Sequence, residues 1–331
     1  MVSATDPAAS ADVRRYALGR AGQAVFVLWA AFTLSFLIMY ALPSDPAQLI
    51  AGTDNNVTPE QLEALRHEYG LDRSLIAQYA DQLGDAVQGD LGRSLRSGRE
   101  VTTLISEAVP ATAQVAGLAF LLALFGGATV AIVATATRNR ALANGLLSLP
   151  PLGVAIPSFW IGLLLLQQFS FNWEWFPAIG NEGWRSVILP AVALAIPTGA
   201  LIAQVLAKSL HRTLREPYID TARAKGASRG RVHLRHAVRN ASLPALTMAG
   251  IIVGNLLSGA VVIETVFSRS GLGRVTSAAV ADQDIRVVQG LVLFGALVFV
   301  TVNLAVDLLY PILDPRIVRS QRRARPAVSP A

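Results

Sequence analysis

The sequence predicts an all-α polytopic membrane protein with six transmembrane helices and both termini in the cytoplasm. Hydrophobic residues make up 53% of the 331 residues and charged residues only 15%, and the mean hydropathy is +0.46. These values indicate a membrane protein, since charged residues make up about 25% of a typical soluble domain. Six apolar runs are each long enough to cross a hydrocarbon core, which takes about 20 residues. Lys and Arg gather in alternate connections between the runs, which the positive-inside rule assigns to the cytoplasm.

Residues 1–20 are predicted to form a cytoplasmic N-terminal tail, and residues 21–42 the first transmembrane helix. The small and polar residues 1–12 are expected to be disordered, and three arginines precede the apolar run. This run is longer than the apolar core of about 7–15 residues in a secretory signal peptide, and no small-x-small cleavage site closes it. We therefore interpret it as a span that is retained.

Residues 43–109 form the longest polar segment and are predicted to lie outside the cytoplasm, with eleven acidic and five basic residues. Thr58 opens a capping box before a helix expected over Pro59–Tyr69, with proline at its first position. A second, amphipathic helix is expected over Ser74–Gln88. Its apolar face comprises Leu75, Ile76, Tyr79, Leu83 and Val87. We interpret the segment as a cap that packs on the membrane domain and offers a docking surface.

Residues 110–313 are predicted to form the core of the protein, with transmembrane helices 2–6. The expected spans are Ala111–Ala136, Ala141–Phe169, Val187–Ala207, Ser242–Phe267 and Val287–Leu313. The first two spans after Ala111–Ala136 contain five prolines, which kink helices and free backbone carbonyl groups. Ordinary packing kinks are one interpretation. The other places Pro157, Ser158, Phe159 and Gln204 beside a translocation path.

A basic loop over residues 208–243 interrupts this core, with nine Lys or Arg side chains against two acidic ones. Pro217 suits the first turn of a helix, and Gly226 is placed to end that helix with a left-handed residue. We expect a second helix over Arg229–Arg239, capped by Ser228 and interrupted by Asn240 and Pro244. The alternative interpretation is a topology anchor, a loop whose positive charge only keeps this connection in the cytoplasm.

The distribution of charge supports this topology. Nineteen of the 28 Lys and Arg residues lie in segments predicted to be inside, including five arginines in the cytoplasmic tail, residues 314–331. The net charge of +6 could indicate nucleic acid, but the cations flank apolar spans. We therefore expect the lipid bilayer as the partner of this chain, and no nucleic acid.

The sequence contains none of the usual signatures of an active site. It has no GxxxxGK[ST] phosphate loop, no evident Ser/His/Asp set and no cysteine. His233 and His236 lie three residues apart but have no thiolate or carboxylate beside them, so we expect no metal site. No catalytic residue and no cofactor is predicted. Glu264 and Asp307 are the carboxylates within the spans, and we interpret both as structural, which favours a path moved by an external motor over ion coupling.

Several stretches resemble one family of membrane proteins. The string DTARAKG places Asp220, Thr221, Ala222 and Gly226 on the pattern of the EAA loop of ATP-binding-cassette importer permeases, with Asp in place of Glu and Thr in place of the first Ala. IPSFWIGLLL, ETVFSRSGLGR and NLAVDLLYPILDPRI resemble the dipeptide, oligopeptide and nickel permeases. The chain departs from that family at Arg269–Ser270, where Trp-Pro is frequent.

The resemblance implies an importer-permease fold and an assembly of several subunits. The residues that it assigns to coupling with the ATPase are Tyr218, Asp220, Thr221, Ala222, Lys225 and Gly226. The implied partners are a second homologous permease, two ATP-binding-cassette ATPase subunits that hydrolyse ATP, and an extracytoplasmic solute-binding protein. Di- or oligopeptides are the implied substrates, while nickel chelates, glutathione and sugars remain open. An ion-coupled secondary transporter and a membrane scaffold without transport activity are the alternative interpretations.

Overall fold

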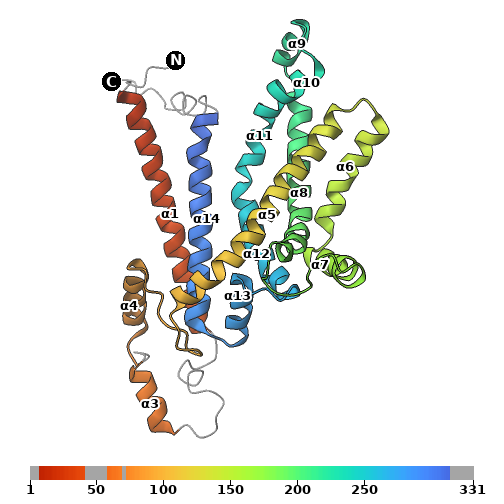
Figure 1. Ribbon diagram of the computed structural model, residues 1–331. Helices are drawn as coiled ribbons and strands as arrows, with labels where there is room; N and C mark the ends of the chain where they lie inside the picture. The colour runs from red at the N-terminus through yellow and green to blue at the C-terminus, as the bar shows by residue number, and fades with distance from the viewer. Residues whose placement is uncertain (1–6, 42–57, 69–71, 314–331) are drawn as a thin grey trace, which may run out of the picture.

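The computed structural model describes residues 7–41, 58–68 and 72–313 of the chain, which are helical almost throughout (Figure 1). The helices are α1 (Pro7–Ala41), α3 (Pro59–Glu68), α4 (Leu75–Val87), α5 (Val101–Ala136), α6 (Arg140–Ala155), α7 (Ser158–Leu165), α8 (Arg185–Thr213), α9 (Pro217–Ala224), α10 (Arg229–Arg231), α11 (Val238–Thr247), α12 (Ala249–Val266), α13 (Leu272–Ala281) and α14 (Ile285–Leu313), with π-helical segments η1 (Leu166–Asn172) and η2 (Val232–Ala237). Within the described ranges the β-structure is an isolated bridge between Arg93 and Glu100.

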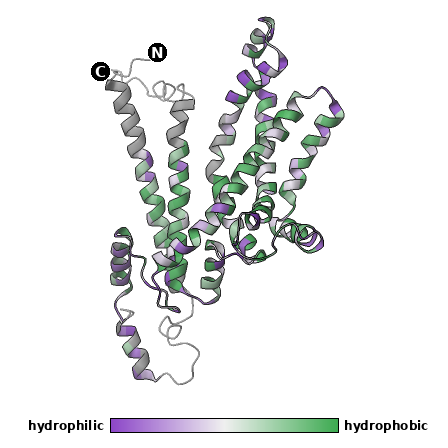
Figure 2. Cartoon of the chain, in the orientation of Figure 1, coloured by the Kyte–Doolittle hydropathy of each residue, from purple (hydrophilic) through white to green (hydrophobic). Residues whose placement is uncertain are grey.

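Four helices are long and apolar enough to cross a membrane by themselves: α1, α5, α8 and α14. A fifth candidate is the pair formed by α6 and α7 with η1, and α12 is apolar but shorter. Figure 2 shows hydrophobic residues along these helices and hydrophilic residues at α9, α10 and α3. The all-α polytopic class is confirmed, while the count of six spans stays a prediction.

The third predicted span, residues 141–169, is not one continuous helix. It bends by 100° between α6 and α7. Pro157 caps α7, and the residue before it, Ile156, is extended at φ −88° and ψ 123°. This break follows from proline chemistry, because the proline ring disfavours helical geometry in the preceding residue. Pro150 and Pro151 lie inside α6 without ending it.

Two further boundaries differ from the sequence prediction. Helix α1 begins at Pro7, so residues 7–12, which were predicted to be disordered, are helical; three of these six residues are alanine, which favours helix. Asn240 and Pro244 do not interrupt the second helix of the basic loop, because both lie inside α11, which follows η2 directly. The helical path instead breaks at Met248, between α11 and α12. Residues 43–57 and 314–331 lie outside the described residues.

Helices α5 and α8 form the centre of the core, with the most extensive packing of any described pair. Glycines allow the two backbones to approach closely. A Cβ atom at Gly127 would lie 2.4 Å from the carbonyl oxygen of Gly199, and one at Gly199 would lie 3.1 Å from that of Ala123. Small residues serve this purpose at helix contacts inside membranes, where close packing replaces the hydrophobic effect.

A buried carboxylate, Glu264, ties three helices together at one end of the core. Its Oε1 accepts a hydrogen bond from Thr112 Oγ1 of α5 at 2.5 Å, and its Oε2 accepts from the backbone N–H of Gly273 at 2.7 Å. The Thr112 hydroxyl in turn accepts from the backbone N–H of Leu272 at 2.8 Å. The carboxylate thus accepts hydrogen bonds from backbone N–H groups in the first turn of α13, where the helix dipole favours negative charge. Glu264 is therefore structural, as expected.

Gly273 is predicted to be intolerant of any side chain, because a Cβ atom there would lie 2.4 Å from the Cα of Val261. We expect Gly273→Ala to destabilise the solubilised protein by about 1–3 kcal/mol, the usual range for overpacking. The matched control is Gly117→Ala, since no atom lies within 4 Å of a Cβ at Gly117. Thermal unfolding in detergent measures both, and an unchanged midpoint for Gly273→Ala would contradict the tight contact.

The two polar regions lie at opposite ends of the molecule, which predicts opposite sides of the membrane. In Figure 1, α9 and α10 lie at the end where α1 starts and α14 finishes, while α3 and α4 lie at the other end. Alkaline phosphatase fused after Arg99 should be active, and the same reporter fused after Gly230 should be inactive. A reporter after Arg99 that behaved as cytoplasmic would refute this topology.

Candidate functional site: the basic loop of residues 208–243

Helix α9 forms the tip of the basic loop, and local sequence signals set both of its ends. Glu216 is extended at ψ 143°, and Pro217 occupies the first helical position. At the other end Gly226 adopts φ +80°, its N–H donates to Arg223 O at 2.9 Å, and the Ala227 N–H donates to Ala222 O at 3.1 Å. This pair of hydrogen bonds is the Schellman motif. The predicted helix over Tyr218–Lys225 and its glycine cap are therefore present.

Ile219 joins α9 to the membrane core. It is the one buried residue of this helix, and its side chain is fully inaccessible. It belongs to an apolar cluster with Leu206 and Leu210 of α8 and with Val232 and Ala237 of η2. Full burial of such a side chain contributes about 1.5–3 kcal/mol. Ile219 therefore links α9 to an apolar cluster that includes residues of α8 and η2.

Tyr218 gives α9 a second attachment. Its hydroxyl accepts a hydrogen bond from Asn240 Nδ2 at 2.8 Å and donates to the carbonyl oxygen of His236 at 3.3 Å. Both partners follow α9 in the chain and belong to η2 and α11. The ring remains 39% exposed, so Tyr218 also contributes to the outer surface of the tip.

The remaining predicted residues of α9 differ in exposure. Asp220, Thr221 and Lys225 are exposed, and Asp220 pairs with Arg223 of its own helix at 3.0 Å. Ala222, which the resemblance also assigns to coupling, is half-buried and lies one turn after Ile219, toward the core side. The open face of the helix is thus carried by the exposed residues, with Ala222 at its margin.

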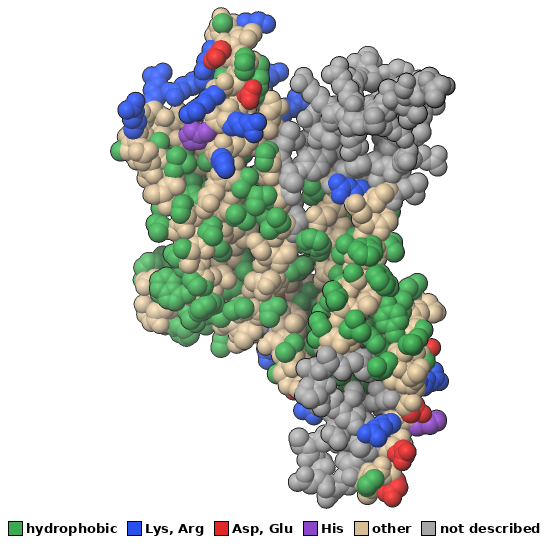
Figure 3. Space-filling model, turned by 180° about the vertical axis from the view of Figure 1, so that it is seen from behind, with side chains coloured by type: hydrophobic (Ala, Val, Ile, Leu, Met, Phe, Trp, Pro, Cys, Tyr) green, Lys and Arg blue, Asp and Glu red, His purple; other side chains and the backbone are tan. Residues whose placement is uncertain are grey.

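Positive charge surrounds this tip. Figure 3 shows Lys and Arg side chains gathered at the end of the molecule that carries α9 and α10. A surface hollow beside the start of α9 is lined by His211, Arg212, Arg215 and Glu216. An acidic or helix-accepting groove of another protein would complement such a surface.

His233 is a contact of this site that the sequence analysis missed. It is 4% exposed, and its Nε2 lies 3.1 Å from the carbonyl oxygen of Thr135 in α5, while its Nδ1 lies 3.3 Å from that of Arg229. The ring thus links the basic loop to a helix 98 residues earlier in the chain. The sequence shows that His233 lies three residues before His236, but it does not show the contact with α5. Among the residues that the structure describes, no group of three His, Cys, Asp or Glu could hold a metal.

The four residues predicted beside a translocation path come from two parts of the fold. Pro157, Ser158 and Phe159 lie at the bend between α6 and α7, where Ser158 is half-buried and Phe159 is 44% exposed. Gln204 is exposed on α8. An apolar cavity of about 350 Å³ between α5, α6 and α8 is lined by none of the four. Its walls are small residues such as Gly126, Gly153 and Ala200.

The opposite end of the molecule is held by buried polar contacts. Arg269 is fully buried, and its Nη1 donates to Gly180 O at 3.1 Å and to Ser186 O at 3.0 Å. Asp284 accepts from Ser94 Oγ at 2.5 Å and from the Leu95 N–H at 3.2 Å. Ser94 and Asp284 are 190 residues apart, so no local pattern could have revealed their contact. These contacts fasten the loops of this end to the core.

Comparison with known proteins gives two family matches and several relatives. Residues 103–319 match the family described as "Binding-protein-dependent transport system inner membrane component", and residues 13–116 match the N-terminal part of such components. A putative peptide transport system permease protein of Brucella abortus is 40% identical over 308 residues, covering 91% of this chain and 98% of the relative. The glutathione transport system permease protein of Escherichia coli K12 is 37% identical over 290 residues, covering 88% and 94%.

Proposed function

Because the chain belongs to the family of binding-protein-dependent transport system inner membrane components, we propose that α9 is the element through which a separate ATPase drives it. The chain is a multi-pass membrane permease of an importer. The observation that carries the proposal is the combination of an exposed face on α9 with a fully buried Ile219 behind it. A helix built in this way can bind a partner on one side and transmit its movement on the other.

Three contacts support a route for that movement into the membrane. Ile219 belongs to the apolar cluster of α8 and η2, Tyr218 bonds to the segment that leads into α11, and His233 reaches the end of α5. Helices α5 and α8 are themselves closely packed. A displacement of α9 would therefore tilt these helices together, as in rigid-body transitions between two states of a packed core.

The proposed assembly contains two permeases, two ATP-binding-cassette ATPases and an extracytoplasmic solute-binding protein. The permease has no phosphate-binding loop in its sequence, so another chain must hydrolyse ATP. We place the solute-binding protein on the outer segment, where α3 carries exposed acidic side chains. Relatives named for peptide and glutathione transport support a small peptide-like substrate.

An ion-coupled transporter is the competing proposal, and Glu264 is the carboxylate within the spans whose contacts the structure describes. A proton carrier needs a carboxylate that can exchange its partners. Glu264 instead accepts hydrogen bonds from Thr112, Gly273 and Arg274 inside a fully buried site. This arrangement favours the ATP-driven importer. Uptake into proteoliposomes that responded to a proton gradient without the ATPase would favour the competitor.

Gly226→Val tests the proposed coupling role of α9. A β-branched residue at φ +80° is strained by about 1–3 kcal/mol, which should displace the tip of the loop. We expect normal membrane insertion, with reduced retention of the ATPase and reduced ATP-dependent uptake in a reconstituted importer.

Gly230→Val is the matched control, since Gly230 lies in α10 with no atom within 4 Å of an added Cβ. It should retain both ATPase binding and uptake. If Gly226→Val matched Gly230→Val in both measurements, the loop would be a topology anchor only.

A further inference from the structure

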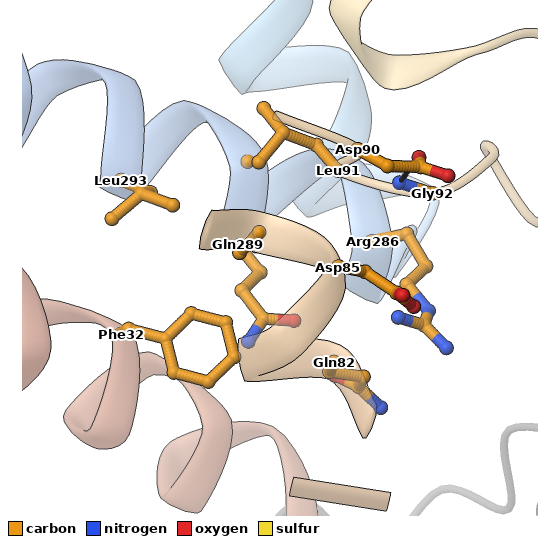
Figure 4. Close-up of a pocket in the computed structure, with 11 residues that line it drawn as sticks. Phe32, Gln82, Asp85, Asp90, Leu91, Gly92, Arg286, Gln289 and Leu293 are labelled. Atoms are coloured by element: carbon orange, nitrogen blue, oxygen red, sulfur yellow. Dashed lines mark hydrogen bonds between the residues drawn. The ribbon is translucent and has the colours of Figure 1, made fainter. Parts of the chain in front are cut away.

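Helix α4 has a protein-facing side that fastens it to α1. The Tyr79 hydroxyl lies 2.8 Å from Thr33 Oγ1, and the Tyr79 ring meets Phe36 edge-on with 5.2 Å between ring centroids. Figure 4 shows Gln82 and Asp85 of α4 around a small pocket that Phe32 of α1 also lines. These contacts fix the position of α4 along α1.

A second side of α4 carries an apolar stripe that is largely exposed in the part of the chain that the structure describes, with Leu83 half-buried. Ile76, Ala80, Leu83 and Val87 recur at spacings of four, three and four residues, which aligns them on one face. Ile76 is 82% exposed and Val87 is 81% exposed. The far side of the helix is polar, and there Asp81 pairs with Arg73 at 2.7 Å.

The attachment to α1 sets the depth of this stripe. Thr33 lies five residues before Ile38, where the apolar stretch Gly19–Ile38 of α1 ends. At a rise of about 1.5 Å per residue, Tyr79 therefore meets α1 about 8 Å inside the end of that stretch. The contact therefore lies within the stretch of α1 that can cross a membrane, toward its outer end, so α4 is held beside the outer part of the bilayer.

The surface of α1 beside α4 is itself apolar and open. Leu34, Leu37 and Ile38 are each more than half exposed, as expected for a helix that faces lipid. Figure 3 shows hydrophobic side chains gathered where the outer end of α1 meets α4. The stripe on α4 thus continues a surface that already contacts the bilayer.

From this continuity we propose that α4 is an interfacial helix that lies on the outer face of the bilayer, with Ile76, Leu83 and Val87 buried among the lipids. A helix with one apolar stripe and one charged face is suited to the boundary between headgroups and acyl chains. In this proposal, lipid covers the apolar stripe of α4, and the solute-binding protein does not. Helix α4 would then hold the outer segment at a fixed height, independently of any role for α9.

Because the chain has no cysteine, single-cysteine variants can test this placement directly. Ile76→Cys and Val87→Cys would be labelled with the environment-sensitive dye NBD, in full-length permease reconstituted into phosphatidylcholine vesicles. Asp81→Cys is the matched control, from the same helix but its polar side. All three positions are exposed, so the substitutions leave the core unchanged.

We expect dyes at positions 76 and 87 to emit at shorter wavelength than the dye at position 81, and to be quenched severalfold more by spin-labelled lipid than by aqueous iodide. The dye at position 81 should show the reverse preference. Iodide quenching at either position 76 or position 87 equal to that at position 81 overturns the proposal. Protection of those positions only after the solute-binding protein is added overturns it as well, in favour of a docking surface.

Discussion

The burial of Ile219 is the contact on which the connection between the exposed tip and the membrane core depends. Seven of the eight residues of α9 are exposed or half-buried, so this helix has little packing of its own. Its surface ion pair between Asp220 and Arg223 contributes little, because exposed pairs are screened by water and salt. Ile219 instead contributes about 1.5–3 kcal/mol and fixes which face of α9 points outward. Tyr218 and His233 then add polar contacts that limit the direction of movement.

At the opposite end of the molecule, buried polar groups hold the structure together, in place of an apolar contact. Glu264, Arg269 and Asp284 are buried polar groups, which are costly to bury unless they are hydrogen-bonded. Each bonds to a segment far away in the chain, so together they fasten the outer loops to α5, α8 and α14. The end that carries these groups is therefore firmly held, while the tip at α9 is attached at a few points. This contrast suits a protein that is moved from the end that carries α9.

The sequence predicted best where local chemistry decides the structure. Pro217 and Gly226 set the ends of α9, and the helix expected over Ser74–Gln88 is present as α4. It predicted less well where the outcome depends on neighbours. The bend at Pro157 separates α6 from α7, whereas Pro244 left α11 intact, and the two prolines look alike in sequence. The partners of His233, Arg269 and Asp284 lie about 80 to 190 residues away, beyond any periodic pattern.

Photo-crosslinking from the tip of the loop tests the central proposal most directly. A photoreactive amino acid at Thr221, exposed on α9, should crosslink the ATP-binding-cassette ATPase in membranes that show ATP-dependent uptake. The same probe at Glu63, on α3 at the other end, should instead crosslink the solute-binding protein. Active membranes in which Thr221 gave no crosslink to the ATPase, or in which Glu63 gave one, would contradict the account.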